Sequence, residues 1–339
     1  MGVLAAALAL AAWMFVQDRS AHAPPRSVEA GAVASPLSII PPGSAFVLTA
    51  DVAQLRHAQL GPMLAERFFV RLGSGAGDLT GLCGFDPLSA LDQVALAVPS
   101  AGLAPSARDG DFGVVATGHF SAAQISRCAS AAIKARGGDP VSTELGAFSS
   151  VRDRNTEGGE VAARDGGPLI VSGGSYFRAL LDAAAGNGAK PEHQDARDAE
   201  HAKLRQLLGS GTIVATWLLS EGWLERVSGE SDARLSPLTN LRALGARLDV
   251  SRVLQLSVLL ECADAASAAK IDALLKQLRS SLDALPLDST LRGVAQRISP
   301  VQEGARLRLN LALSEPELRA LLDMLGPAAP SRASDNPLH

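Results

Sequence analysis

The chain has 339 residues, 47% of them hydrophobic, and its formal net charge is −4. The hydrophobic fraction excludes a wholly disordered chain, and the length predicts one large domain or two ordinary ones. Charges of both signs are scattered along the chain and only 4% of the residues are aromatic. We therefore expect neither the basic surface nor the stacking platform of a protein that binds nucleic acid.

The N-terminus opens with an uncharged apolar run over residues 3–16. The run is short for a membrane-spanning helix, which needs about 20 apolar residues, but long enough for the apolar region of a signal peptide. Ala21-His22-Ala23 offers a signal-cleavage pattern, Pro24 directly after it disfavours cleavage, and no basic residue precedes the run. We expect a cell-envelope protein on the periplasmic side, tethered to the inner membrane by this segment. A cleaved signal and a buried helix of a soluble protein are the alternatives.

Composition and turn residues divide the rest of the chain into a body and two flexible ends. An alanine- and proline-rich stretch without periodicity follows the apolar run, and the last residues are polar and rich in proline. We predict a signal anchor or signal peptide at 1–17, an Ala/Pro-rich linker at 18–40, a first α+β unit at 41–207, a second α+β unit at 208–326 and a disordered tail at 327–339.

In the first unit, apolar runs of strand length alternate with helical patterns. Strands are predicted at 45–51, 93–99, 112–118, 147–153, 159–165 and 168–173, with helices after the first strand, after the third and at 175–184. The helix after the third strand begins with Ser121 and Gln124, the spacing of a capping box, and ends at Gly137-Gly138.

The second unit repeats this order. Strands are predicted at 212–219, 243–250 and 253–262, followed by a long helix at 265–285, two strands around a turn at 303–304 and a last helix that begins at Ser314. The closing helices of the two units nearly match, because residues 177–182 read FRALLD and residues 318–323 read LRALLD. The match and the shared order predict an internal duplication. Strands joined in pairs by tight turns predict an α+β fold of two related units, each a mainly antiparallel sheet with helices packed on one face.

Three cysteines are spread along the chain without a CxxC pair, so no standard zinc site is expected. Cys128 lies on the apolar stripe of a predicted helix and Cys262 ends a strand on its apolar side, which is typical of small core residues. Cys83 lies in a loop. In an oxidising compartment one pair can form a bridge, and we predict Cys83 with Cys128.

A glycine turn supplies the one candidate for anion binding. Gly173, Gly174 and Ser175 lie between a predicted strand and a predicted helix, where free main-chain N–H groups can bind an anion. The alternative is a tight turn in which Ser175 caps the helix.

The densest group of ligand-type side chains lies in a wholly polar stretch. It comprises His193, Asp195, Asp198, Glu200 and His201. Because no apolar residue is present to hold a first coordination shell, we predict a solvated loop rather than a metal site.

Other reactive residue types occur without the context that their chemistry needs. Ser267 and Lys270 have the S-x-x-K spacing of serine β-lactamases, but no K-T-G follows. His119 is predicted to face solvent, and Asp51 is predicted to cap the helix that follows it. We therefore expect no catalytic residues, no cofactor and no metal.

Two local motifs carry a loose resemblance. The P-x-x-A-F-V-L strand at 42–48 and the CGFDPL loop at 83–88, after an apolar N-terminus, resemble uncharacterised exported proteins of GC-rich bacteria. The resemblance concerns the body as a whole and implies no residue roles. The leading hypothesis is a non-enzymatic cell-envelope protein that binds a protein partner or an apolar ligand through its duplicated body. The alternatives are an enzyme of unrecognised type and a structural or assembly subunit of an envelope complex.

Overall fold

The computed structural model describes residues 35–64, 79–87, 89–99, 111–155, 159–174, 176–187, 196–220, 222–224, 233–283 and 289–324. The predicted N-terminal membrane segment, most of the linker and the predicted tail lie outside these residues. Among the described residues, no helix is both long and apolar enough to cross a membrane.

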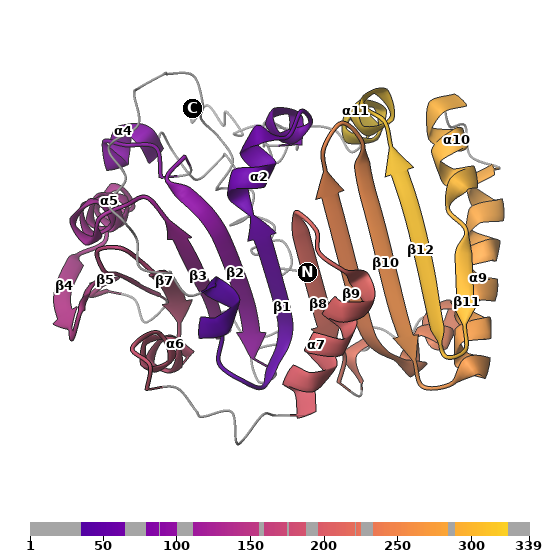
Figure 1. Ribbon diagram of the computed structural model, residues 1–339, viewed down its shortest axis with the longest axis horizontal. Helices are drawn as coiled ribbons and strands as arrows, with labels where there is room; N and C mark the ends of the chain where they lie inside the picture. The colour runs from indigo at the N-terminus through magenta and orange to yellow at the C-terminus, as the bar shows by residue number, and fades with distance from the viewer. Residues whose placement is uncertain are drawn as a thin grey trace, which may run out of the picture.

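The described strands form one continuous antiparallel sheet of twelve strands (Figure 1). Their order across the sheet is β11-β12-β10-β9-β8-β1-β2-β3-β7-β6-β5-β4. The strands are β1 (Ser44–Asp51), β2 (Leu91–Pro99), β3 (Phe112–Gly118), β4 (Pro140–Leu145), β5 (Phe148–Asp153), β6 (Glu160–Ala163), β7 (Leu169–Gly173), β8 (Ile213–Leu218), β9 (Leu241–Val250), β10 (Leu254–Cys262), β11 (Pro300–Glu303) and β12 (Arg306–Leu313). The sheet runs through the boundary predicted between the two units, because β1 pairs with β2 on one side and with β8 on the other.

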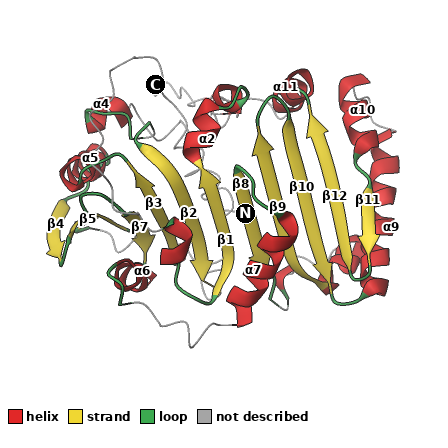
Figure 2. Cartoon of the chain, viewed as in Figure 1, coloured by secondary structure: helices red, strands yellow, loops and turns green. Residues whose placement is uncertain are grey.

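Helices pack against the sheet formed by these strands (Figure 2). The helices are η1 (Pro36–Ile39), α2 (Val52–His57), α4 (Leu79–Cys83), α5 (Ala122–Ala135), α6 (Tyr176–Ala184), α7 (Ala196–Leu208), η4 (Ala233–Asn240), α9 (Ala265–Asp283), α10 (Ser289–Arg297) and α11 (Glu315–Met324). The capping box predicted for α5 is present, since Ser121 Oγ accepts from the Gln124 N–H and Gln124 Oε1 accepts from the Ser121 N–H. The antiparallel α+β class is confirmed.

The sheet is covered by helices on both faces, whereas the sequence predicted them on one. Successive side chains of a strand point to opposite faces. Leu48 of β1 packs in the cluster that contains Ile125 of α5, while its neighbour Val47 packs in the cluster that contains Leu180 of α6. We call these the α5 face and the α6 face. The reason for the two layers is that β1, β2 and β3 are apolar on both sides, so each side needs a cover.

The remaining helices divide between these two faces. The α5 face also carries α2, α9, α10 and α11, whose side chains pack on β9, β10 and β12. The α6 face also carries η1 and α7, and α7 packs there through Leu204 and Leu208. Helix α7 therefore covers the same face of β8 and β9 that α6 covers in the first unit.

Counted outward from the β1–β8 pair, the two halves of the sheet begin with the same strand order. The first half runs β1, β2, β3, β7, β6, β5, β4 and the second half runs β8, β9, β10, β12, β11, so the first half has two further strands at its edge. In both halves a long helix, α5 or α9, follows the third strand along the chain. The helices that carry the FRALLD and LRALLD match, α6 and α11, nevertheless pack on opposite faces. That sequence match thus joins helices in different positions, and the duplication stays a prediction.

Two glycines let the helices of the α6 face approach the sheet. A Cβ added to Gly113 of β3 would come within 2.9 Å of the Tyr176 ring and would collide with Leu180. A Cβ added to Gly245 of β9 would come within 2.8 Å of Leu208 in α7. Each half therefore places a glycine under the helix that crosses it, where a larger residue would force the helix away.

Candidate ligand-binding face at the junction of the two units

A row of apolar side chains crosses the β1–β8 junction on the α5 face. Phe46 of β1 stands opposite Trp217 of β8, and Trp217 stands opposite Leu244 of β9. The row continues in register on both sides of these three. Its members, in order, are Val98, Phe46, Trp217, Leu244, Leu260 and Leu307. We call this set the apolar row.

Burial changes along the apolar row. Val98 at one end is 1% exposed and Leu307 at the other is 0% exposed, whereas Phe46, Trp217 and Leu244 in the middle are only half-buried. Helix α5 contacts the outer strands of the first half and α9 contacts those of the second, so the middle of the row lies between these two helices. Large apolar side chains thus stay partly accessible at the centre of the sheet.

The row of side chains next to the apolar row has shorter side chains on β8 and β9. Ala215 of β8 stands opposite Leu48 of β1 on one side and opposite Ala246 of β9 on the other. Both alanines are half-buried. Because a methyl group projects much less than an indole ring, the two alanines form a low floor beside Trp217 and Leu244.

Two tryptophans meet at the edge of the apolar row. Trp223, which follows β8, contacts the Trp217 ring edge-on, with ring centroids 5.9 Å apart and planes at 66°. The indole nitrogens of both side chains are buried, and among the described residues neither has a hydrogen-bond partner. Buried polar groups without partners are rare in folded proteins.

The opposite face of the junction is polar and closed. His201 of α7 is 6% exposed, with Nδ1 2.8 Å from the Thr216 hydroxyl and Nε2 2.9 Å from the main-chain oxygen of Ser44. Burial lowers the pKa of His201, and the hydrogen bond to Ser44 opposes this shift. Since Thr216 is 0% exposed, this hydroxyl–imidazole pair lies away from any substrate.

The solvated loop predicted around His201 is wrong from residue 196 onward. These residues form α7, in which His201 shares its buried side with Leu204 and Leu208. The stretch looks wholly polar because histidine stands at the first buried position of the helix. Asp198 accepts from the Gly43 N–H at 3.2 Å; His193 and Asp195 lie outside the described residues.

Tyr176 and Arg205 extend the polar contacts beneath α7. The Tyr176 hydroxyl lies 2.9 Å from Ser44 Oγ, and burial raises the pKa of Tyr176 to about 12. The Arg205 guanidinium donates to Thr49 Oγ1 at 2.8 Å, and burial lowers the pKa of Arg205. The imidazole of His201 contacts the carbonyl of Ser44 rather than its hydroxyl, so His201 is not placed as a base for this serine. We interpret the cluster as a polar connection between the two halves.

The glycine turn proposed for anion binding contains the chain's own carboxylate. A Cβ added to Gly174 would collide with Asp111 Oδ1, so that carboxylate lies directly against the turn. The Asp111 carboxylate therefore takes the place in which an external anion would contact Gly174. Gly173 is the last residue of β7, and Ser175 lies outside the described residues.

The titratable residues considered for an enzyme have separate partners. The side chain of His119 is 81% exposed and its Nε2 lies 3.2 Å from Asp92. Asp51 caps α2 as predicted, accepting from the Gln54 N–H at 2.7 Å. Each carboxylate therefore has a local structural partner.

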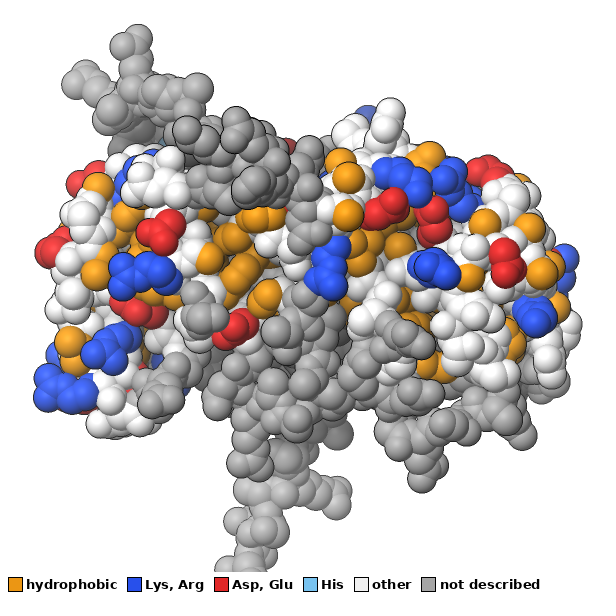
Figure 3. Space-filling model, turned by 90° about the horizontal axis from the view of Figure 1, so that it is seen from below, with side chains coloured by type: hydrophobic (Ala, Val, Ile, Leu, Met, Phe, Trp, Pro, Cys, Tyr) orange, Lys and Arg blue, Asp and Glu red, His pale blue; other side chains and the backbone are white. Residues whose placement is uncertain are grey.

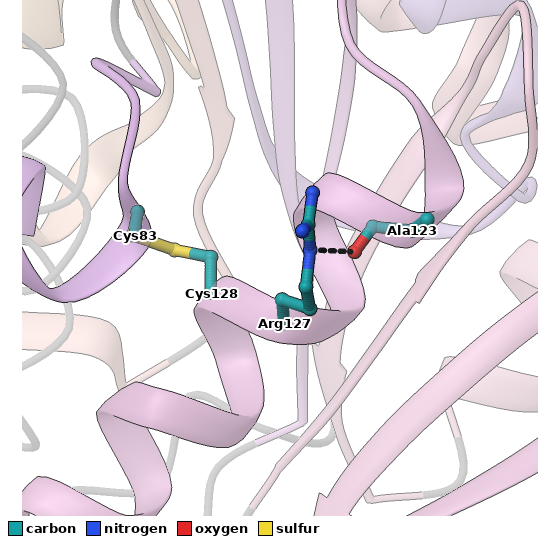
Figure 4. Close-up of a disulfide and its surroundings, with 4 residues drawn as sticks. All are labelled: Cys83, Ala123, Arg127 and Cys128. Carbon is teal, nitrogen blue, oxygen red and sulfur yellow. Dashed lines mark hydrogen bonds between the residues drawn. A yellow bond between two sulfur atoms is a disulfide. The ribbon is translucent and has the colours of Figure 1, made fainter.

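A disulfide joins α4 to α5 on the α5 face (Figure 4). It links Cys83 to Cys128, and the two Cα atoms are 4.2 Å apart. Arg127, the residue before Cys128 in α5, donates from Nε to the Ala123 carbonyl at 3.3 Å. Cys128 is thus a bridging residue rather than a small core residue. Cys262 is a buried free thiol, and burial raises its pKa.

Comparison with known proteins yields a likeness of fold. No protein-family model and no curated protein matches this chain. Crystal form III of TP0453 matches with a TM-score of 0.51 and 13% identity, covering 86% of this chain and 99% of that one. Crystal form IV of TP0453 matches with a TM-score of 0.50 and 14% identity, covering 86% and 97%. At this identity the likeness concerns the fold and not the function.

Proposed function

We propose that this chain is a non-enzymatic protein of the cell envelope that binds an apolar ligand at the apolar row. The observation that carries the proposal is the half-burial of Phe46, Trp217 and Leu244 beside the low floor of Ala215 and Ala246. Partly exposed apolar side chains that adjoin one another mark ligand or partner sites more often than single exposed ones.

The surface agrees with a local apolar site rather than a uniformly polar molecule. Seen from below, hydrophobic side chains gather in patches that are bordered by charged ones (Figure 3). Ligand sites are usually apolar with a few polar groups that orient the ligand.

Two features support the envelope location. The apolar run at 3–16 has the length of a signal region. The disulfide between Cys83 and Cys128 belongs to an oxidising compartment, because cytosolic thiols are kept reduced.

Binding can be tested with an uncharged apolar fluorescent probe on the purified full-length protein. We expect the Trp217→Asp variant to lose binding, because a carboxylate in the middle of the row would be desolvated by the probe. Val301→Asp is the matched control, since Val301 is 54% exposed on the edge strand β11 and away from the junction. If the row variant and the control variant bind the probe with the same affinity, the proposal is overturned.

A second variant covers the case in which Trp217→Asp does not fold. Ala215→Leu adds apolar volume to the floor without adding charge, and should reduce probe binding while circular dichroism stays unchanged. Unchanged probe affinity in a folded Ala215→Leu protein would also count against the site. A third outcome is that the wild type does not bind the probe but binds a protein partner that neither variant binds. The row would then be a protein interface.

The location is tested by fractionation of native cells with intact mass and thiol counting on the same sample. A full-length, membrane-bound chain with one thiol after denaturation is expected. A soluble cytoplasmic chain with three free thiols would overturn the envelope assignment.

A further inference from the structure

An apolar hollow lies at the edge of the sheet, where α9 packs against α10 and β11 (Figure 1). Its volume is about 150 Å³, and its apolar lining consists of Leu275, Leu278, Ala295, Ile298 and Pro300. We call it the α9–α10 groove. We propose that this groove binds a short aliphatic carboxylate, with the chain among these side chains and the carboxylate at Arg279. The groove is separate from the apolar row, so either site can exist without the other.

The groove leaves apolar surface in contact with solvent. Leu278 is 51% exposed, although it belongs to a helix that packs on the sheet. Leu275 forms the inner wall, because it also packs on the core cluster that contains Ile271 and Leu307. Ala295 is 7% exposed and carries only a methyl group, which leaves room between the two helices. An apolar cavity of this volume holds a molecule as large as benzene, so the groove holds a chain of about six carbon atoms.

The charged side chains that line the groove are both cations. They are Lys276 and Arg279 of α9, and among the described residues no carboxylate lines the groove. Lys276 has an acidic partner, because its Nζ lies 2.7 Å from Asp272. Arg279 donates to the main-chain oxygen of Ile298 at 3.4 Å, and within the described part of the chain it has no acidic partner. The guanidinium has further N–H donors, which match the two oxygens of a carboxylate.

Charge and volume together define the ligand. A purely hydrocarbon ligand would cover Arg279 and remove its water without replacing the lost hydrogen bonds. A carboxylate replaces those hydrogen bonds and supplies the negative charge, while its aliphatic chain covers Leu278. A chain longer than about six carbon atoms extends beyond the groove into solvent.

Binding can be measured by NMR on the full-length protein with isotope-labelled leucine methyl groups at neutral pH. The probes are butanoate, hexanoate, octanoate and hexanol, and hexanoate should shift the methyl signals of Leu275 and Leu278. Affinity should rise about fourfold per methylene from butanoate to hexanoate, because each methylene is buried, and much less from hexanoate to octanoate. Hexanoate should bind about fivefold more tightly than hexanol, because only the carboxylate pairs with Arg279.

Two variants separate the head of the ligand from its chain. Arg279→Gln should lower the affinity for hexanoate to that for hexanol and leave hexanol binding unchanged. Its matched control is Arg252→Gln, which removes the same charge from an exposed residue in the turn between β9 and β10. Leu278→Asp should abolish binding of hexanoate and hexanol. Its control is Leu82→Asp, since Leu82 is 36% exposed on α4 in the other half of the sheet.

Three results would overturn the proposal. They are unshifted Leu275 and Leu278 signals with every probe, equal affinities for hexanoate and hexanol, and unchanged hexanoate binding in a folded Arg279→Gln protein. Hexanoate binding that is lost in Trp217→Asp but kept in Leu278→Asp would place the carboxylate at the apolar row, and would also overturn the proposal. Loss in Leu278→Asp with full binding in Trp217→Asp is the expected result, and it leaves the test of the apolar row unaffected.

Discussion

His201 Nε2 lies 2.9 Å from the main-chain oxygen of Ser44, a residue 157 positions earlier in the chain. Since a carbonyl only accepts, Nε2 carries the proton, and Nδ1 is free to accept from the Thr216 hydroxyl at 2.8 Å. The neutral imidazole therefore joins α7 to both strands of the junction. The α6 face of the junction is closed by these polar contacts, and the proposed site lies on the other face.

This arrangement predicts a pH dependence of stability. Burial lowers the pKa of His201 below its ordinary value of 6.5, so the unfolded chain takes up a proton before the folded one does. The contribution of His201 is complete above pH 6.5 and falls as the pH drops below it, by at most about 1.4 kcal/mol per pH unit. Urea unfolding at about pH 7.5 and at about pH 5.5 measures this loss of stability.

Two variants isolate the His201 effect from that of the carboxylates. His201→Gln should unfold more easily at both pH values but lose part of the difference between them. His119→Gln should behave like the wild type, because the His119 side chain is 81% exposed. An unchanged pH difference in His201→Gln would contradict the assignment of the buried neutral imidazole.

Tyr176 offers an independent measure of the same cluster. It is the single tyrosine of the chain, and burial raises its pKa to about 12. Phenolate absorbance of the native protein should therefore stay low at pH 10 and rise only near pH 12 or on unfolding. Because the unfolded phenol ionises first, stability should fall as the pH rises above about 10. Tyr176→Phe should reduce this alkaline fall, and the remainder belongs to Cys262 and Lys203, whose pKa values are raised by burial and by the carboxylate of Glu261 respectively; a native titration midpoint near pH 10 would exclude a buried hydroxyl.

The disulfide should contribute to stability through the loop that it closes. Cys83 and Cys128 are 45 residues apart in sequence, and a bridge over such a loop stabilises the folded state by about 2–4 kcal/mol. Urea unfolding of a Cys83→Ser/Cys128→Ser protein should show this loss, and added reductant should then have no further effect. Cys262→Ser keeps the bridge and should retain the sensitivity to reductant, which serves as the control.

Two glycine-to-alanine changes should have opposite signs. Gly113→Ala places a methyl group against Tyr176 and Leu180, so α6 must shift and the protein should lose about 1–3 kcal/mol. Gly293 lies inside α10 with nothing within 4 Å of an added Cβ. Gly293→Ala should therefore stabilise the protein by about 0.5–1 kcal/mol. Thermal unfolding of the two variants measures both, and a stable Gly113→Ala protein would mean that α6 packs less closely than described.

The sequence by itself determined much of the local structure of this protein, although β4 was not predicted and α7 begins inside the stretch predicted as a loop. Strands and helices follow from residue spacing, and the caps at Ser121 and Asp51 form as predicted because capping depends on residues three apart. The antiparallel α+β class also followed, since strands that adjoin in sequence pair through short turns.

Only the tertiary structure decided which distant residues meet. The pairing of β1 with β8 joins Phe46 to Trp217 and creates the apolar row, and no local pattern encodes a partner so far along the chain. The same pairing lets His201 of α7 contact the main-chain oxygen of Ser44, so a histidine from a polar stretch of the sequence is buried in the folded protein. The match between α6 and α11 misled for the same physical reason: an amphipathic sequence specifies a buried side of a helix but not the face of the sheet that the side covers.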